Sequence, residues 1–262
     1  MVYNGDVDEP KQLIHAILIA DLSPTQLSTI QEQFGLGANL LSPYPTQQLF
    51  ITDKRSWAPL SHLEIWHNTP HHDDEPGYFP LIIIDAETPR DNAVWFIDST
   101  AMQEDVDNGE AESLNTLYKV RMELANIPIS YVNFEIANTD IREAMSNAGI
   151  PWLVPEEFTQ EKPYSVGFDY VKNRYVNPTW VIAEPDEIEE SREWEILKTF
   201  LPSPEVVYRL KEHVAQENGL TANWAVGSDR KDDRFPEGSK ILQVNYDPAI
   251  AVPRYEKPEG SL

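Results

Sequence analysis

The stretch PLIIIDAETPRDNAVWFIDS, residues 80–99, decides the fold predicted for this chain. Two apolar runs, rich in β-branched and aromatic residues and typical in length of strands, lie at its ends. Between them, ETPRDN brings together residues that favour turns. The stretch therefore predicts two antiparallel strands, residues 80–86 and 93–99, joined as a long hairpin.

The rest of the chain mixes strand and helix patterns. In the N-terminal part we expect strands at 13–21, 47–53, 62–67 and 127–137, and helices at 114–125, at 138–149 and from Ser23-Pro24 to the glycines of GLG, residues 35–37. In the C-terminal part we expect strands at 165–171, 174–183, 221–227 and 240–247, and helices at 184–201 and 202–219. Because strands and helices do not alternate regularly, the sequence predicts an α+β fold with a mixed or antiparallel sheet packed with several helices.

A proline-rich stretch, residues 151–163, is the best candidate for a boundary inside the chain. It predicts an N-terminal, β-rich unit over residues 1–155 and a smaller C-terminal αβ unit over residues 156–262. The alternative is that the two form one continuous domain.

Composition excludes several classes of function. The chain has 262 residues, 41% of them hydrophobic, which is typical of a folded protein, and it has no cysteine. Disulfides, zinc–thiolate sites, iron–sulfur clusters and thiol nucleophiles are therefore excluded. The net charge of −24 argues against nucleic-acid partners and against anionic membranes. Because the N-terminus lacks the pattern of a signal peptide, we expect a cytoplasmic protein.

Acidic residues are concentrated in one part of the chain. Residues 73–112 hold twelve acids and a single base, Arg90. The pattern is typical of a solvated acidic face that maintains solubility, and it also fits a surface that docks a basic protein.

The segment NFEIANTDIREAM, residues 133–145, resembles a signature found in a family of acidic proteins that is known only as a domain of unknown function. The resemblance rests on six positions, with a hairpin of the LIIID…VWFID kind before them: Asn133, Ile136, Ala137, Asn138, Asp140 and Glu143. It covers roughly residues 13–150, and the long acidic insert between the hairpin and the signature departs from the family's pattern. It implies a fold and no activity.

A metal site is one hypothesis for the stretch HNTPHHDDEP, residues 67–76. Its candidate ligands are His67, His71, His72 and Asp74, because imidazole and carboxylate groups suit divalent transition metals. Pro70 disfavours a helix that would place His67 and His71 on one face. The alternative is an exposed polar turn. No other cofactor is expected.

Two groups of polar residues are candidates for acid–base chemistry. Asp85 and Asp98 each end a strand of the predicted hairpin, where they could share a pocket and divide the roles of acid and base, or simply bond to turn amides. Tyr131, Asn133 and Glu135 alternate along a predicted strand, so they would line one side of it, facing either a cleft or solvent.

The favoured hypothesis for function is a protein that binds a small molecule, or an accessory biosynthetic enzyme. It would use these acid–base groups in a pocket lined by aromatic residues, with Trp66, Trp95 and Trp152 as candidates beside Tyr131. The alternatives are a non-enzymatic protein that docks a basic partner and, third, a metal-dependent enzyme at residues 67–74. No motif for nucleotide binding or for a serine nucleophile is present.

Overall fold

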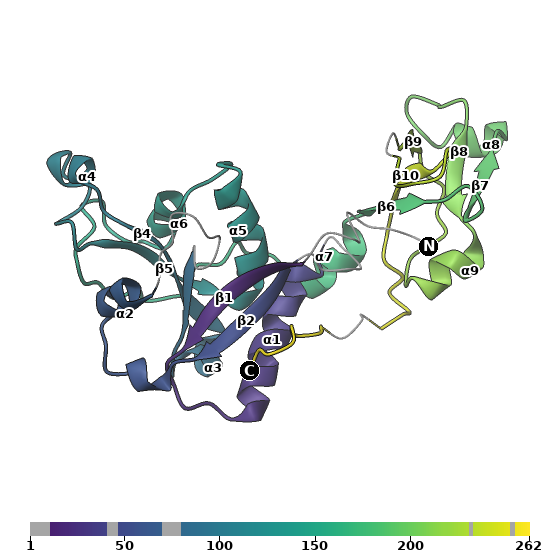
Figure 1. The fold of residues 1–262 in the computed structure, drawn as a ribbon. Helices are drawn as coiled ribbons and strands as arrows, with labels where there is room; N and C mark the ends of the chain where they lie inside the picture. Colours follow the sequence, from purple (N-terminus) through teal and green to yellow (C-terminus); the bar gives the residue numbers. More distant parts are fainter. Residues whose placement is uncertain (1–10, 41–46, 70–79, 231–232, 252–254) are drawn as a thin grey trace. The chain divides into compact units, whose positions relative to one another are not determined.

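The computed structural model describes residues 11–40, 47–69, 80–230, 233–251 and 255–262. The chain divides into two compact units, which are drawn in Figure 1 and are described separately below. The larger unit takes residues 12–38, 47–168 and 255–262, and the smaller unit is formed chiefly by residues 169–251. This division differs from the predicted boundary at residue 155, and it returns the last residues of the chain to the larger unit.

The larger unit is built on a five-stranded sheet with the order β2-β1-β3-β4-β5 (Figure 1). The first three strands are parallel, whereas β4 runs antiparallel to both β3 and β5. The strands are β1 (Gln12–Leu18), β2 (Gln47–Asp53), β3 (Leu81–Ile84), β4 (Ala93–Thr100) and β5 (Leu117–Glu123). The sheet is therefore mixed, and the predicted α+β class is confirmed. The hairpin β3–β4 is present as predicted, with the short helix α3 (Thr88–Asp91) in its connection.

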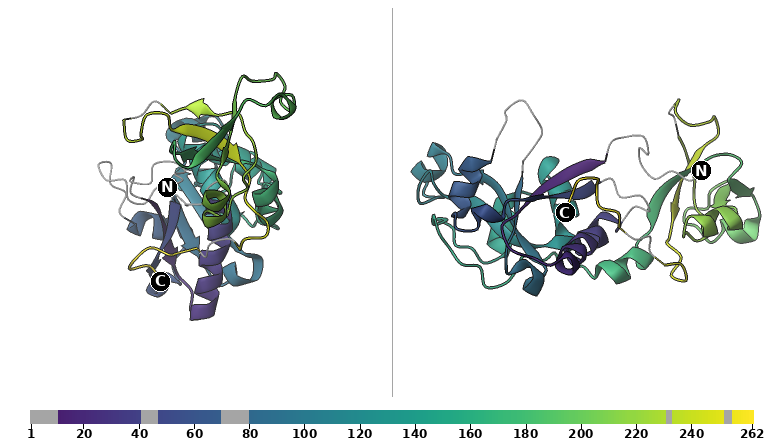
Figure 2. Two further views of the ribbon diagram at one scale, coloured as in Figure 1. Left: turned by 90° about the vertical axis from the view of Figure 1, so that its right-hand side faces the viewer. Right: turned by 60° about the horizontal axis from the view of Figure 1, so that its bottom comes forward.

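Helices lie on both faces of this sheet (Figure 2). One face packs against a large apolar cluster that includes residues of α1 (Pro24–Ala38), α5 (Ile127–Glu135) and α6 (Ile141–Asn147). The opposite face packs against a smaller cluster with residues of α2 (His62–Asn68). Alternation along β4 divides its side chains between the two, with Val94 and Phe96 in the first cluster and Ile97 in the second. The remaining short helices of the unit are η1 (Arg55–Trp57), α4 (Gln103–Asp107) and η2 (Leu124–Asn126).

Three predicted elements of this unit have the wrong type. The expected strand at 62–67 is α2, because Ser61 and Glu64 form a capping box that starts a helix. The expected helix at 114–125 is mainly β5, where Tyr118, Val120 and Met122 belong to one cluster and the buried Lys119 and Arg121 alternate with them. The expected strand at 127–137 is α5, which has a proline in its first turn.

Helix α1 continues past the glycines at which it was expected to end. Gly35 and Gly37 lie inside it, at positions where neighbouring atoms leave no room for a Cβ. A Cβ on Gly37 would lie 1.9 Å from the carbonyl oxygen of Ala125, and one on Gly35 would lie 2.5 Å from the Cβ of Tyr255. These glycines allow close packing and do not stop the helix.

Residues 255–262 cover part of the exposed edge of β2. The amide of Leu49 donates to the Tyr255 hydroxyl at 2.8 Å, the amide of Ile51 donates to Ser261 Oγ at 2.9 Å, and the amide of Leu262 donates to the Ile51 carbonyl at 3.2 Å. Edge strands with free amides pair readily with other chains, so this segment protects the edge.

The smaller unit contains two antiparallel sheets, β6-β10-β9 and β7-β8. Its strands are β6 (Thr179–Ala183), β7 (Ile188–Ser191), β8 (Val207–Leu210), β9 (Ser228–Asp229) and β10 (Lys240–Val244), and its helices are α7 (Tyr170–Val176), α8 (Trp194–Leu197) and α9 (Glu212–Glu217).

Several predictions for the smaller unit were wrong. The expected helices at 184–201 and 202–219 are replaced by the hairpin β7–β8 and two short helices. Prolines at 185, 202 and 204 fall inside these ranges and disfavour long helices. The expected strands at 165–171 and 221–227 do not form, and the one at 174–183 is shortened by α7, while 240–247 does contain β10. No helix in the described ranges has the length and apolar character needed to span a bilayer.

Candidate functional site

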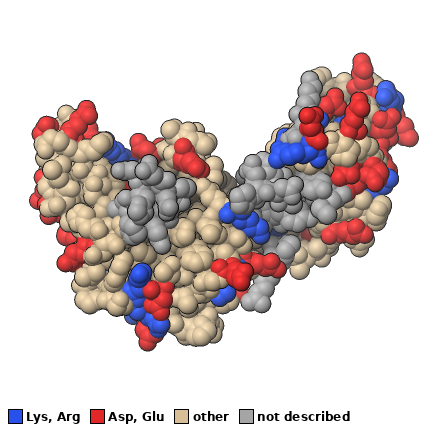
Figure 3. Space-filling view, in the orientation of Figure 1, with Lys and Arg blue, Asp and Glu red and all other residues tan. Residues whose placement is uncertain are grey.

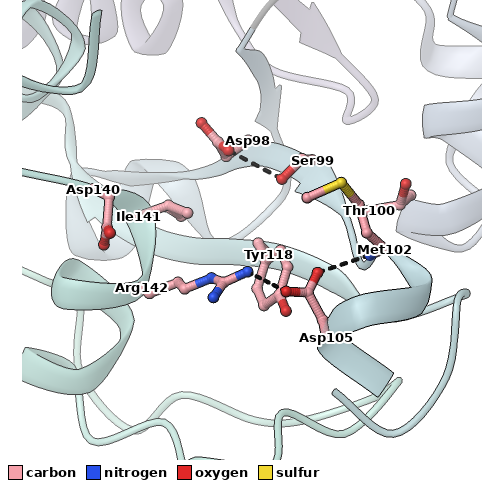
Figure 4. Close-up of a pocket in the computed structure, with 9 residues that line it drawn as sticks. All are labelled: Asp98, Ser99, Thr100, Met102, Asp105, Tyr118, Asp140, Ile141 and Arg142. Carbon is pink, nitrogen blue, oxygen red and sulfur yellow. Dashed lines mark hydrogen bonds and ion pairs between the residues drawn. The ribbon is translucent and has the colours of Figure 1, made fainter. Parts of the chain in front are cut away.

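A small polar pocket lies in the larger unit, where β4 and β5 meet α4 and α6 (Figure 4). Its volume is about 220 Å³. The lining side chains come from four separate parts of the chain: Asp98, Ser99, Thr100, Met102, Asp105, Tyr118, Asp140, Ile141 and Arg142.

Asp98 reaches the pocket from the end of β4. The pairing of β4 with β5 shifts in register between Ile97 and Ser99, an irregularity of the kind that re-aims side chains at the end of a strand. The hydroxyl of Ser99 donates to Asp98 Oδ2 at 3.0 Å. Burial raises the pKa of Asp98, and the nearby Asp140 carboxylate adds to this effect. Within the described residues Asp98 forms no ion pair with a base, so its charge is only partly compensated.

Arg142 is the one base among the described residues that line the pocket, and it is already paired with two acids. Its guanidinium pairs with Asp105, and it donates to Glu110 at 2.7 Å. The other carboxylate oxygen of Asp105 accepts a hydrogen bond from the amide of Met102 at 2.7 Å. Burial alone would raise the pKa of Asp105, but these hydrogen bonds outweigh it and lower the pKa. The Arg142–Asp105–Glu110 group is therefore a rigid ionic wall of the pocket.

Tyr118 lies behind that wall and is only 3% exposed. The Arg142 guanidinium lies 4.7 Å from the centre of its ring. The hydroxyl is buried beside Asp105, which also accepts hydrogen bonds from Arg142 and from the amide of Met102, and its interaction with Asp105 contributes to the lowered pKa of that acid. Burial raises the pKa of Tyr118 to about 12, so the phenol keeps its proton at neutral pH.

Asp140 closes the pocket from the start of α6. It is the N-cap of that helix, and its Oδ1 accepts from the amide of Glu143 at 2.8 Å. The helix predicted at 138–149 is therefore present, but it begins later than expected, after the Asp140 cap. Three carboxylates thus face a space that holds one guanidinium, which favours ligands with a positive charge and hydrogen-bond donors.

A second polar group lies on the other side of β5 and is internally paired. The guanidinium of Arg121 donates to Asp85 at 2.8 Å and to Asp91 at 2.6 Å. Beside it, Lys119 Nζ lies 3.4 Å from Nδ1 of His62 and 5.4 Å from the ring centre of Trp95. Burial, with the charge of Lys119, lowers the pKa of His62 to about 4, and burial lowers the pKa of Lys119. Arg121 is thus paired with two acids, and Lys119 Nζ lies 3.7 Å from Glu157 Oε2, so the charges are compensated as expected for a structural network.

The carboxylates of Asp85 and Asp98 do not share a pocket. Leu81 pairs with Ile97 and Ile83 with Trp95, so the two acids lie at opposite ends of the β3–β4 pair. Asp85 instead accepts hydrogen bonds from the amides of Glu87 and Thr88, the alternative that the sequence left open. Arg121 outweighs the effect of burial and lowers its pKa, whereas the pKa of Asp98 is raised.

The expected polar face of Tyr131, Asn133 and Glu135 is not formed, because these residues lie on α5, where alternate residues point in different directions. Tyr131 packs against the larger cluster of the core, and Asn133 accepts hydrogen bonds from Asn138 after the helix ends.

The predicted aromatic residues are also dispersed. Trp66 is buried in the smaller cluster and Trp95 packs against the same cluster, whereas Trp152 is exposed. None of the three lines the described pocket.

The predicted metal ligands His71, His72 and Asp74 lie outside the described residues. His67 is in the last turn of α2 and is exposed. Among the residues that the structure describes, no group of three or more His, Asp or Glu side chains is arranged to hold a metal. The metal site therefore stays a prediction.

Of the predicted site residues that the structure describes, Asp98 is the one that lines the pocket. Sequence reasoning missed Asp105, Tyr118, Asp140 and Arg142. The signal for two of them was present, since Asp105 and Asp140 stand where short helices begin. Comparison with protein-family models, curated proteins and solved structures finds no match to this chain.

Proposed function

We propose that the protein binds a small polar molecule with a cationic amine in the pocket at Asp98. The observation that carries the proposal is Asp98 itself, a largely buried carboxylate that forms no ion pair with a base among the described residues. Its pKa is raised, because the charge of Arg142 and the hydrogen bond from Ser99 offset only part of the effect of burial. Removing a carboxylate from water without a partner is unfavourable, and an ammonium group in the pocket would supply that partner.

The other lining groups define the rest of the ligand. The hydroxyls of Ser99 and Thr100 can bond to a hydroxyl or carbonyl on the same molecule. A volume of about 220 Å³ is below the range typical of drug-sized ligands, so a compact metabolite is favoured. A carboxyl group with a raised pKa is also suited to exchange a proton with the bound molecule.

The test uses three probes of nearly equal size: ethanolamine, ethylene glycol and glycolate. They differ in charge, so their relative affinities separate a cation site from a general polar pocket. Ligands this small reach at best about 1.5 kcal/mol per heavy atom, so binding should be followed by NMR shifts of the backbone amides of residues 98–102 and 140–142. We expect ethanolamine to bind most tightly and glycolate least.

The matched variants are Asp98→Asn and Asp107→Asn. Both remove one carboxylate, but Asp107 is on α4 and does not line the pocket. Asp98→Asn should weaken ethanolamine roughly tenfold, to the level of ethylene glycol, while Asp107→Asn should have little effect. Equal affinities for the three probes, or tight binding of ethanolamine by Asp98→Asn, would rule the proposal out.

A further inference from the structure

We infer that a second surface of the larger unit docks a cationic polypeptide segment that also carries an apolar side chain. This surface, called here the acidic–aromatic surface, consists of Trp152, Leu153 and Leu114 together with the acids Glu112 and Glu156. The inference does not depend on a ligand in the pocket.

The backbone that presents these residues is held by hydrogen bonds between two segments far apart in the sequence. The amide of Glu112 donates to the carbonyl of Val154 at 2.9 Å, and the amide of Val154 donates to the carbonyl of Glu110 at 2.8 Å. The amide of Glu156 donates to Glu112 Oε2 at 2.9 Å. Trp152 and Leu153 therefore extend from a fixed backbone next to the acids, and docking would order little new structure.

The apolar side chains of this surface are unusually exposed. Trp152 is 59% exposed, Leu153 54% and Leu114 52%. These side chains belong to two segments that are hydrogen-bonded to each other. Exposed aromatic and aliphatic side chains in neighbouring segments are typical of interaction sites, and tryptophan is enriched among the residues that dominate binding. Leu153 also has a φ of 59°, a conformation that bulky residues rarely adopt. Its local conformation has a cost that a role in binding would explain.

The charges beside these side chains select the partner. Residues 101–115 contain five acids and residues 150–157 contain two, and neither segment contains a lysine or arginine. Arg142, which reaches this region, is already paired with Asp105 and Glu110. Figure 3 shows acidic side chains gathered over the end of the larger unit that carries α4. A cationic segment complements this surface, whereas a second copy of a chain with net charge −24 would be repelled.

The test is direct binding of a fluorescent peptide that alternates lysine with leucine, measured by anisotropy with the full-length protein. Two control peptides separate the contributions, one with glycine in place of leucine and one with glutamate in place of lysine. We expect the lysine–leucine peptide to bind best and the glutamate peptide not to bind. Trp152→Ala should weaken the lysine–leucine peptide roughly tenfold or more.

Trp194→Ala is the matched control, because Trp194 lies in the smaller unit and is 65% exposed. It should leave the affinity unchanged. Glu112→Gln, which keeps an acceptor for the Glu156 amide, should lower the association rate roughly twofold, with a smaller effect at high salt. The inference would be overturned if the lysine–leucine and lysine–glycine peptides bound equally well and Trp152→Ala had no effect. Binding would then be due to non-specific electrostatic attraction alone. Failure of the lysine–leucine peptide to bind would overturn the inference as well.

Discussion

Leu153 shows at the scale of one residue how local conformation and surface chemistry can oppose each other. Its backbone lies in the left-handed region, which costs an L-residue with a Cβ roughly 1–2 kcal/mol. Its side chain is more than half exposed, so burial offsets only part of this cost. A glycine would relieve the conformation, but it would remove the side chain from the acidic–aromatic surface.

Comparison of Leu153→Gly with Leu153→Ala isolates that cost. Both variants remove most of the side chain, but only glycine adopts a positive φ freely. We expect the glycine variant to be more stable than the alanine variant by about 1 kcal/mol in urea unfolding. At Val132, which is exposed on α5, the same pair should give the opposite order by about 1 kcal/mol, because alanine is the better helix former. The same order at both positions would show that Leu153 is not strained.

The candidate site also shows what single residues reveal in advance. Asp98 could be named from the sequence because it ends an apolar strand. Its actual neighbours could not, because Tyr118 and Arg142 lie 20 and 44 residues further along the chain and their proximity depends on how α6 packs on β5. Asp85, the partner expected for Asp98, lies too far away. The C-terminal ends of two antiparallel strands lie at opposite ends of the strand pair.

Among the elements of the larger unit, the strands with strong apolar runs and the helices α1 and α6 were predicted well, whereas the segments at 62–67, 114–125 and 127–137 were given the wrong type. Strands β1 to β4 fall inside the predicted ranges or within one residue of them. Strand β5 was mistaken for a helix because Lys119 and Arg121, which are normally exposed types, are buried by the pairs with Glu157, Asp85 and Asp91. Burial of charged groups depends on tertiary partners, so hydrophobic periodicity alone did not reveal this strand.

Strand β2 lies at the edge of the sheet, and the side chain of Tyr255 bonds to its backbone. Tyr255 accepts a hydrogen bond from the amide of Leu49, and burial raises the pKa of this tyrosine to about 12, so the phenol stays neutral at physiological pH. Tyr255→Phe keeps the ring against Phe34 and removes only the acceptor. We expect the variant to lose about 1–3 kcal/mol of stability and the Leu49 amide to exchange with solvent faster. Tyr175→Phe, in the smaller unit, is the control, and unchanged exchange at Leu49 in Tyr255→Phe would contradict the role of the tail.

Across the whole molecule, composition and sequence pattern did not predict that the larger unit is built from segments that are far apart in the sequence. The larger unit is interrupted after residue 168 and is resumed at residue 255. A proline-rich stretch marks a change in local structure, but only long-range contacts such as those of Ser261 with Gln31 and Ile51 show that the chain returns. A boundary predicted from composition therefore cannot assign the final residues to their unit.

The dependence of stability on pH tests the second polar group of the larger unit. Burial beside Lys119 lowers the pKa of His62 from 6.5 to about 4 in the folded protein. Because the unfolded chain binds a proton below pH 6.5 and the folded chain does not, this histidine lowers stability as the pH falls from 6.5 to 4. The full stability is present above pH 6.5, and the loss by pH 4 is of the order of 3 kcal/mol.

Asp98 acts in the opposite direction, because its pKa is raised in the folded protein. Protonation of this carboxyl therefore favours folding, and the stability it contributes is lost as the pH rises from the unfolded value of 3.8 through the raised folded value. Relief of repulsion among the acids of a chain with net charge −24 has the same sign at mildly acidic pH. A single pH profile would therefore mix these effects with that of His62, and only a difference between two variants isolates the histidine.

His62→Asn supplies that difference, since the amide oxygen can accept from Lys119 in place of Nδ1 but does not titrate. We expect the free energy of unfolding of the native protein, relative to that of the variant, to fall by about 3 kcal/mol between pH 7.5 and pH 4. Hydrogen exchange at the amides of β5 measures this difference without a contribution from the smaller unit. His15, whose pKa burial also lowers, is present in both proteins and cancels. A difference that stays constant across this range would show that His62 is not held neutral by its surroundings, and the network of Lys119, Trp95 and His62 would then have to be open to water.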